Sequence, residues 1–254
     1  MLNTKVNKEY TKKIVEIADA HYREIAGQTH KRDEEFIKYP HLFVFGCVMD
    51  SQINADKAWK IPEQIAEALG GKDFSLFCSK DLAWYREQFE NKKLHRFNQE
   101  MSKAFYSAVI KIKEDYNGDA SNMWNDEPTS AELVFRFLEF EKVGIKIATM
   151  AANLLSRDYG VVLKDKYAIE ISPDVHVKRT IYRLGLLPEV KNVDFKFIDS
   201  NKVIYAAKSL NPEFPGVLDS VCWYIGKKKI CTNDGCFSNE NNKCPFSDFC
   251  IRQK

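Results

Sequence analysis

Hydrophobic positions recur every three or four residues along most of the chain, which is the spacing of amphipathic helices rather than of strands. Residues 9–26 predict one such helix, and residues 94–119 predict a long core helix closed by the pair Asn117-Gly118. The run LFVFGCVM at 42–49 is apolar throughout, so it fits either a buried helix or a buried strand. With no convincing pair of strands and no internal repeat, the pattern predicts an all-α protein.

Turn-forming residues divide the helical stretches from one another. Residues 61–71 predict a helix that opens on a proline and stops at two glycines. Ser130 is expected to cap the next helix, and Gly144 separates that helix from a further one with its own apolar stripe. Shorter helices are predicted at 175–184, which a glycine stops, and at 200–209.

Composition narrows the class of protein only a little. The chain has 254 residues, 44% of them hydrophobic and 29% charged, and no apolar run approaches the roughly 20 residues of a membrane span. The N-terminal residues lack the apolar core of a signal peptide, so we expect a cytoplasmic protein, nucleoid-associated if bacterial, with its seven cysteines reduced. A net charge of +2 is no strong nucleic-acid signature, and any such binding face must come from local clustering.

The segment FLEFEKVGIKIATMAANLL at 137–155 predicts a helix, a tight turn at Val143-Gly144 and a second helix. Such a hairpin directs backbone N–H groups outward where a DNA phosphate can bind them, although a plain pair of antiparallel helices gives the same pattern. Lys146 falls in the first turn of the second helix, where the positive end of the helix dipole disfavours an ammonium and favours a nucleophilic amine. In isolation the residue fits a solvated lysine or a phosphate contact as well.

Two further features carry chemistry. Asp174 precedes the helix at 175–184, where it can cap the helix or present a carboxylate to a cleft. Four cysteines crowd the last 24 residues, and four thiolates suit an iron–sulfur cluster or tetrahedral zinc. These candidate ligands are Cys231, Cys236, Cys244 and Cys250. Cys222 is a conceivable substitute ligand, whereas Cys47 and Cys78 lie in apolar surroundings and are expected to be structural.

Four stretches, in this order along the chain, resemble the helix-hairpin-helix DNA glycosylases, and among them the endonuclease III-like branch with a C-terminal iron–sulfur loop. They are MDSQINADKAW (49–59), FEKVGIKIA (140–148), SPDVHV (172–177), and GKKKIC (226–231) followed by three more cysteines. Each stretch is weakly specific alone. Their joint presence in the family's order makes the resemblance strong, and it covers the chain from about residue 41 to its end.

The resemblance implies a role for each candidate residue. Gln52 would fill the gap left by a flipped base, Lys146 would be the catalytic lysine, and Asp174 the catalytic aspartate. The remaining expected DNA contacts are Lys142, Val143, Gly144, Ile145, Lys227, Lys228 and Lys229. The cysteines would hold a 4Fe–4S cluster, with structural zinc as the alternative. Because a related subgroup without this lysine only removes the base, Lys146 implies a DNA glycosylase that is also an AP lyase.

The resemblance also implies a two-domain, monomeric protein acting on double-stranded DNA that contains a damaged, modified or mispaired base, with no membrane involved. A six-helix barrel domain with the hairpin would cover 39–188, and residues 1–38 plus 189–254 would form the helical domain with the cysteine loop. Two other functions stay open. One is a monofunctional glycosylase using water activated by Asp174, and the other is a non-catalytic protein that binds DNA structures.

The chain departs from the family pattern in three places. Lys142 occupies the first glycine position of the hairpin, giving KVG rather than GVG. The 28 positions between Lys146 and Asp174 are more than in endonuclease III, and the extra residues are expected to form a loop. The cysteines are spaced C-x4-C-x7-C-x5-C, whereas the family has C-x6-C-x2-C-x5-C, so only the last interval matches.

Overall fold

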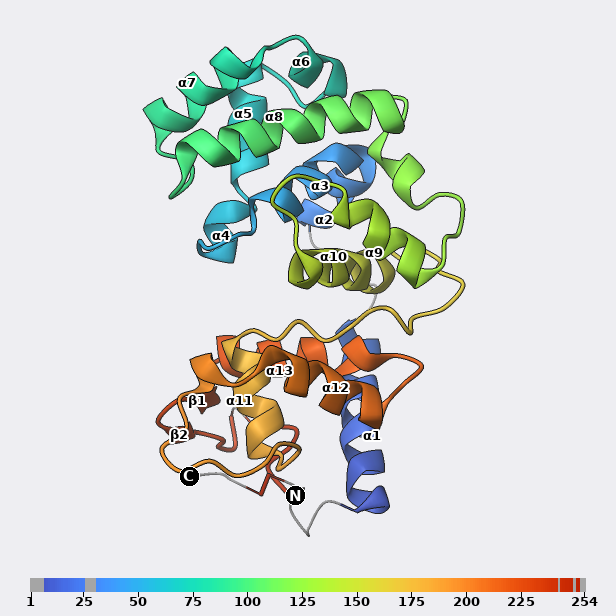
Figure 1. Cartoon of the computed structure of the whole chain (residues 1–254), viewed down its shortest axis with the longest axis vertical. Helices are drawn as coiled ribbons and strands as arrows, with labels where there is room; N and C mark the ends of the chain where they lie inside the picture. Colours follow the sequence, from blue (N-terminus) through green and yellow to red (C-terminus); the bar gives the residue numbers. More distant parts are fainter. Residues whose placement is uncertain (1–6, 26–30, 242, 249, 252–254) are drawn as a thin grey trace. The chain divides into compact units, whose positions relative to one another are not determined.

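The computed structural model describes residues 7–25, 31–241, 243–248 and 250–251. Helices dominate it, and the prediction of an all-α protein is confirmed. The chain divides into two compact units (Figure 1): unit 1 comprises Met1–Ala26 and Asp165–Lys254, and unit 2 comprises Gly27–Lys164. Among the described helices, none combines the length and the apolar character needed to cross a bilayer.

Unit 2 is built around one buried helix, α3 (Pro40–Met49). Every residue of α3 after its first is buried, and α2, α5, α8 and α10 pack against it. Burial on all sides explains why the run at 42–49 shows no helical periodicity although it forms a helix. The other helices of unit 2 are α2 (Lys31–Lys38), α4 (Ala55–Ala58), α5 (Ile61–Leu69), α6 (Phe74–Cys78), α7 (Leu82–Lys92), α8 (Asn98–Asp115), the 3-10 helix η1 (Ala120–Met123), α9 (Ser130–Leu138) and α10 (Ile145–Asp158).

Helix ends in unit 2 follow the turn residues closely, with two corrections. Gly70 ends α5 in the left-handed conformation expected of a helix-terminating glycine. The helix predicted over 94–119 is shorter, because α8 spans Asn98–Asp115. Ser130 is not the cap of α9: Thr129 caps it, and the Thr129 hydroxyl and the Glu132 carboxylate form a reciprocal capping box. Ser130 is instead the first residue of the helix and is buried.

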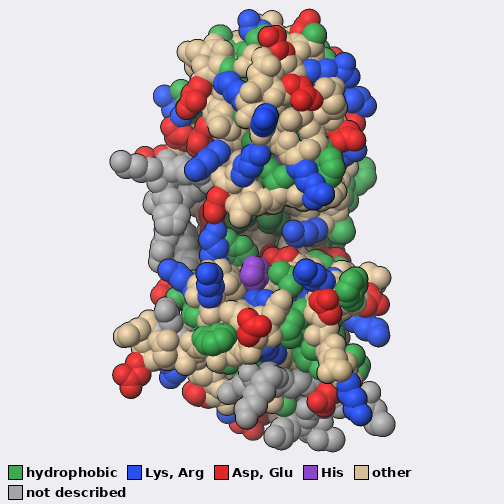
Figure 2. Space-filling view, turned by 90° about the vertical axis from the view of Figure 1, so that its left-hand side faces the viewer, with side chains coloured by type: hydrophobic (Ala, Val, Ile, Leu, Met, Phe, Trp, Pro, Cys, Tyr) green, Lys and Arg blue, Asp and Glu red, His purple; other side chains and the backbone are tan. Residues whose placement is uncertain are grey.

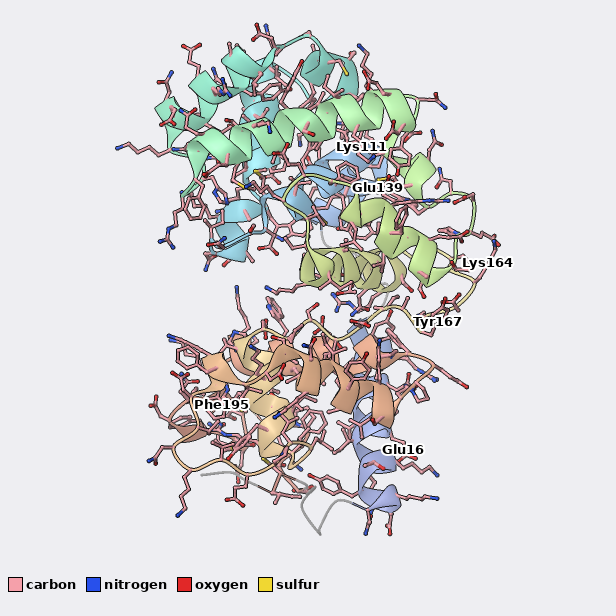
Figure 3. All side chains as sticks on the ribbon, in the orientation of Figure 1. Glu16, Lys111, Glu139, Lys164, Tyr167 and Phe195 are labelled. Atoms are coloured by element: carbon pink, nitrogen blue, oxygen red, sulfur yellow. The ribbon has the colours of Figure 1, made fainter. Side chains whose placement is uncertain are left out.

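An ion pair joins the long helix α8 to the hairpin formed by α9 and α10. The Lys111 Nζ lies 3.8 Å from the Glu139 Oε1 just after α9, and 2.7 Å from the Asp115 carboxylate within α8 (Figure 3). Burial of the Lys111 amine lowers its pKa, but the two carboxylates outweigh this effect and the net shift is upward. The hairpin is thus attached to the rest of unit 2 by charge as well as by apolar packing.

Unit 1 has a separate core formed mainly by α1, α11 and α13. Ile14 and Ala18 of α1 pack with Val177 and Ile181 of α11 and with Val221 of α13. Its elements are α1 (Lys8–Ile25), α11 (Val175–Arg183), the 3-10 helices η2 (Phe195–Phe197) and η3 (Pro215–Leu218), α12 (Ser200–Leu210), α13 (Asp219–Lys227), β1 (Cys231–Thr232) and β2 (Gly235–Cys236). The two short strands pair antiparallel, so the expectation of no strand pair is corrected at this one hairpin.

The boundaries of the two units differ from the predicted domain limits. The chain passes into unit 1 at Asp165 instead of after residue 188, because the apolar face of α11 belongs to the core that α1 and α13 share. The N-terminal boundary falls near residue 27 instead of 39, because α2 packs against α3 and Phe36 is buried beside Phe43. Asp174 therefore belongs to the same unit as the cysteine loop, and Lys146 to the other unit.

His41, at the start of α3, should make unit 2 less stable in acid. Its buried ring donates from Nε2 to the Lys72 carbonyl at 2.9 Å, and burial lowers the pKa of His41 to about 4. The unfolded chain takes up this proton near pH 6.5, so the folded state loses stability as the pH falls from about 6.5 to about 4. This loss approaches about 3 kcal/mol of unfolding free energy. Urea unfolding of wild type and His41→Gln at about pH 7 and about pH 4.5 measures it.

The comparison isolates His41 because every other titrating group is common to both proteins. The wild type should lose more unfolding free energy between the two pH values than His41→Gln loses. Equal losses in the two proteins would show that His41 does not carry this acid sensitivity.

Candidate active site

The turn between α9 and α10 is a tight hairpin that ends at the N-terminus of a helix. Lys142 adopts a left-handed backbone with φ +70°, and the Val143 N–H donates to the Phe140 carbonyl at 3.1 Å. A left-handed conformation costs a non-glycine residue roughly 1 kcal/mol, which explains why glycine suits this position in the family. The Val143 side chain is buried and anchors the turn, whereas the Lys142 side chain is exposed. The lysine thus adds a positive charge to the hairpin without occupying its interior.

Gly144 opens α10 without a side chain that could cap it. Its φ of −103° is one that any residue adopts, and in the described chain a Cβ at Gly144 would meet no atom within 4 Å. The fold therefore does not require glycine here. What glycine provides is access to the first turn of α10, whose backbone N–H groups and positive dipole end suit an anion. Ile145 and Lys146 follow on this turn, and both side chains are exposed.

A half-buried carboxylate lies in the electrostatic range of Lys146. Asp50 ends α3, and its backbone N–H donates to the Cys47 carbonyl at 3.1 Å. Burial raises the pKa of the Asp50 carboxyl, while the charge of Lys146 and a hydrogen bond donated by the Trp59 side chain lower it. Unit 2 thus places a carboxylate within electrostatic range of the amine that sequence motifs mark as the nucleophile.

Gln52 lies in the bend that follows α3 and is exposed, with a left-handed φ of +57°. The buried His95 supports the preceding residue, Ser51, because its Nε2 lies 3.1 Å from the Ser51 carbonyl oxygen. The other ring nitrogen, Nδ1, accepts a hydrogen bond from the Phe97 N–H at 3.1 Å. This pair of contacts requires the neutral ring, and burial lowers the pKa of His95 accordingly. The result is a fixed base for an exposed glutamine with a left-handed backbone.

In unit 1, Asp174 is the N-cap of α11. Its Oδ1 accepts hydrogen bonds from the backbone N–H groups of His176 at 2.8 Å and Val177 at 2.9 Å. The structural role predicted from the sequence is therefore confirmed. Because both capping bonds go to one oxygen, capping orients the carboxylate and leaves Oδ2 free of these two bonds.

His176 connects Asp174 to the neighbouring elements of unit 1. Its Nδ1 lies 2.9 Å from the Arg179 guanidinium, which also donates to the Asn233 side chain at 3.1 Å. A Cβ at Gly226 would come within 2.1 Å of the His176 ring, so only glycine permits this close packing of α13 on α11. Burial lowers the pKa of His176, and the charge of Asp174 opposes that effect.

Lys227 is the last residue of α13, and the basic segment Lys227–Lys229 leads from this helix toward the first cysteine, Cys231. All three side chains are exposed, and the Lys227 Nζ lies 5.4 Å from the centre of the Trp223 ring. Lys229 has a left-handed backbone, with φ +56°, that turns the chain into β1. Figure 2 shows one face of the molecule, on which lysine and arginine side chains recur with acidic side chains between them. Lys227–Lys229 is therefore a local group of positive charges that the small net charge does not reveal.

The four cysteines lie in one folded loop. Cys231 and Cys236 are paired across the β1–β2 hairpin, and Cys231 and Cys244 are buried. Burial raises the pKa of Cys244 to about 11, and the other three thiols add to this shift. The buried Arg183 donates to the Cys231 Sγ at 3.1 Å and to the Gly235 carbonyl at 2.9 Å. The Cys250 Sγ lies 3.6 Å from the Arg183 carbonyl, so Arg183 contacts both ends of the loop.

Four thiols are a suitable number and type of ligand for an iron–sulfur cluster or for zinc. The four cysteines of this loop are also close enough for the other three to affect the pKa of Cys244. The side-chain positions do not complete such a site. In the part of the chain that the structure describes, no three His, Cys, Asp or Glu side chains converge as ligands of one ion. The proposed ligand set therefore stays a prediction.

The structure groups the predicted site residues into two sets. Unit 2 brings the hairpin, Lys146 and the segment before Gln52 together, and unit 1 brings Asp174 together with Lys227 and the cysteine loop. Sequence reasoning missed Asp50, although a carboxylate at the end of a wholly apolar run was a visible signal. It also missed the support from Trp59 and His95, for which no local pattern exists.

Comparison with known proteins identifies the fold. No family model matches the sequence, and no curated protein matches it either. A solved structure of endonuclease III, trapped as a covalent intermediate with DNA in an estranged-adenine complex, matches with a TM-score of 0.58 at 13% identity over 96% of both chains. The 8-oxoguanine DNA glycosylase of Thermotoga maritima aligns with a TM-score of 0.47 at 17% identity, over 89% of this chain and 94% of that one. The chain therefore has the fold of endonuclease III, and the helix-hairpin-helix glycosylase fold predicted from the motifs is confirmed.

Proposed function

We propose that the protein is a base-excision DNA glycosylase with AP-lyase activity, which removes a modified or mispaired base from duplex DNA. One observation carries the proposal: an exposed lysine, Lys146, stands in the first turn of α10 directly after an open hairpin. The fold supports it, because the matching endonuclease III was caught covalently bound to DNA. A covalent intermediate needs an accessible nucleophile next to a backbone-binding element, and the Lys142–Lys146 segment supplies both.

The first steps bind the DNA and expose the target base. The first turn of α10 binds a backbone phosphate, and Lys142 and the Lys227–Lys229 segment add charge-based contacts to the same strand. A base stacked in a duplex cannot be reached, so the nucleotide rotates out of the helix and Gln52 occupies the vacated space. The rigid support of Ser51 by His95 keeps the glutamine in place while the stack is open.

The chemical steps belong to Lys146 and Asp174. The neutral amine of Lys146 forms a bond from Nζ to the sugar C1′, the C1′–N bond breaks, and its electron pair leaves with the base. The sugar ring then opens to an imine, and loss of a C2′ proton expels the 3′ phosphate and nicks the strand. Asp174 stabilises the positive charge that develops on the sugar as the base leaves.

Reductive trapping tests this function. The wild-type protein is incubated with duplex DNA containing an abasic site, and borohydride is added to convert the imine to a stable amine. A covalent protein–DNA adduct on a denaturing gel is the expected result, and a reaction without borohydride is the control. In a parallel reaction on duplex DNA that still contains a damaged base, base release without any adduct would indicate a monofunctional glycosylase, and binding without either reaction a non-catalytic DNA-binding protein.

We further propose that Cys231, Cys236, Cys244 and Cys250 hold a 4Fe–4S cluster, with zinc as the alternative. The group would fix the loop that follows Lys227–Lys229, so that these lysines contact the DNA backbone. Protein purified without oxygen should be brown and contain about four iron atoms per chain by elemental analysis. Zinc would give a colourless protein with about one metal ion per chain. A folded protein containing neither metal would contradict the proposal.

A further inference from the structure

We propose that Asp50 is the positioning and proton-accepting partner of Lys146, held in place by the indole N–H of Trp59 at the junction of α3 and α10. The inference rests on the proposed function, because it assigns how the nucleophile of that reaction is oriented and deprotonated. It adds a second carboxylate to the site, on the same unit as the lysine.

The packing of two helices brings the groups together. Phe43 near the start of α3 contacts Tyr159 just after α10, with ring centres 5.2 Å apart. The two helices also pack against each other, and this contact between the start of α3 and the end of α10 is the one expected if the end of α3 lies toward the beginning of α10 (Figure 1). Asp50 is the residue that ends α3, and Lys146 is the second residue of α10. The charge of Lys146 lowers the pKa of Asp50, which agrees with this placement.

Trp59 fixes the carboxylate from the other side. Its indole ring lies against Gly46, where a Cβ would come within 2.5 Å of the ring, and against Phe43 at 5.6 Å between ring centres. Phe36 contacts the same ring, so packing restricts its orientation. The indole N–H is a donor only, and its hydrogen bond to Asp50 uses part of the acceptor capacity of the carboxylate. The remaining capacity is available to the ammonium group of Lys146.

The proposed proton transfer from Lys146 to Asp50 depends on the exclusion of water from the site. In the free protein Lys146 is exposed, so water solvates the charged forms of the lysine and of the nearby carboxylate. When DNA covers the pair and excludes water, the charged form becomes more costly and the neutral amine–acid pair is favoured. One N–H bond of Lys146 breaks and an O–H bond forms on Asp50. With an abasic site the freed lone pair adds to the C1′ aldehyde, and loss of one water gives the imine.

The test compares trapping rates on abasic duplex DNA for the wild type, Asp50→Asn and Trp59→Phe. Asparagine keeps the shape and an acceptor for Trp59 but cannot take the proton. Asp50→Asn should form the adduct about 100-fold more slowly at neutral pH, with DNA affinity unchanged or higher because a negative charge is lost. The deficit should shrink as the pH rises from about 7 to about 9, because hydroxide in solution then replaces Asp50 as the proton acceptor. Trp59→Phe should fall between the two proteins.

Asp56→Asn is the matched control, since Asp56 is an exposed carboxylate six positions further along the chain on α4. It should trap DNA at the wild-type rate. Equal rates for Asp50→Asn and wild type, or a deficit that is the same at every pH, would overturn the role of Asp50 and leave the proposed function intact. The absence of an adduct with the wild type would instead overturn the proposed function.

Discussion

Lys146→Ala should lose the borohydride-trapped adduct with abasic duplex DNA, by about 1,000-fold or more relative to the wild type. The covalent step cannot occur without the amine, and no partial substitute remains on the shortened side chain. Because Lys146 is exposed, its removal leaves no cavity and should change the unfolding free energy by less than about 0.5 kcal/mol. Adduct formation is measured on denaturing gels, and folding by circular dichroism and urea unfolding.

Lys164→Ala provides the control for this experiment. Lys164 is an exposed lysine of the same unit, distant along the chain from the hairpin (Figure 3), and its removal should leave the adduct yield unchanged. An adduct that persists in Lys146→Ala would mean that another amine attacks the sugar. Peptide mapping of the trapped product would then identify that amine and contradict the assignment of Lys146.

Local sequence signals predicted where helices begin and end better than they predicted which elements are buried. Gly144 interrupts an apolar stripe, so the start of α10 and the position of Lys146 were visible in the sequence. The conformation of α3 was not, because a helix buried on all sides has no polar face to reveal its period. The β1–β2 pair has two residues per strand, which is too short for any alternation to appear.

In the candidate site, too, some residues could be predicted from local sequence patterns and others depend on tertiary packing. Lys146 and Asp174 lie at helix starts, which turn and capping residues mark in the sequence. The neighbourhood of Asp50 and Lys146 joins positions 96 residues apart, and only the packing of α3 against α10 creates it. Trp59 and His95 act from still other elements, so their contribution depends on the folded core and not on any motif.

Asp174 combines two roles that substitutions can separate. As the N-cap of α11 it stabilises the helix, and as a carboxylate it is proposed to stabilise the charged sugar. Asparagine caps helices about as well as aspartate, so Asp174→Asn should keep the unfolding free energy within about 0.5 kcal/mol of wild type. Alanine cannot cap, and Asp174→Ala should lose about 1 kcal/mol. Both variants should release a base or form the adduct about 100-fold to 1,000-fold more slowly.

The pair of variants decides between an enzyme and a DNA-binding protein that keeps the fold. If Asp174 only caps α11, Asp174→Asn should match the wild type in every property, and Asp174→Ala should differ in stability alone. If the carboxylate acts on the sugar, both variants should be equally slow although only one is destabilised. Single-turnover kinetics of base release from damaged duplex DNA, together with urea unfolding of the same preparations, distinguish these results, because a capping defect alters stability while the loss of a negative charge alters the chemical step.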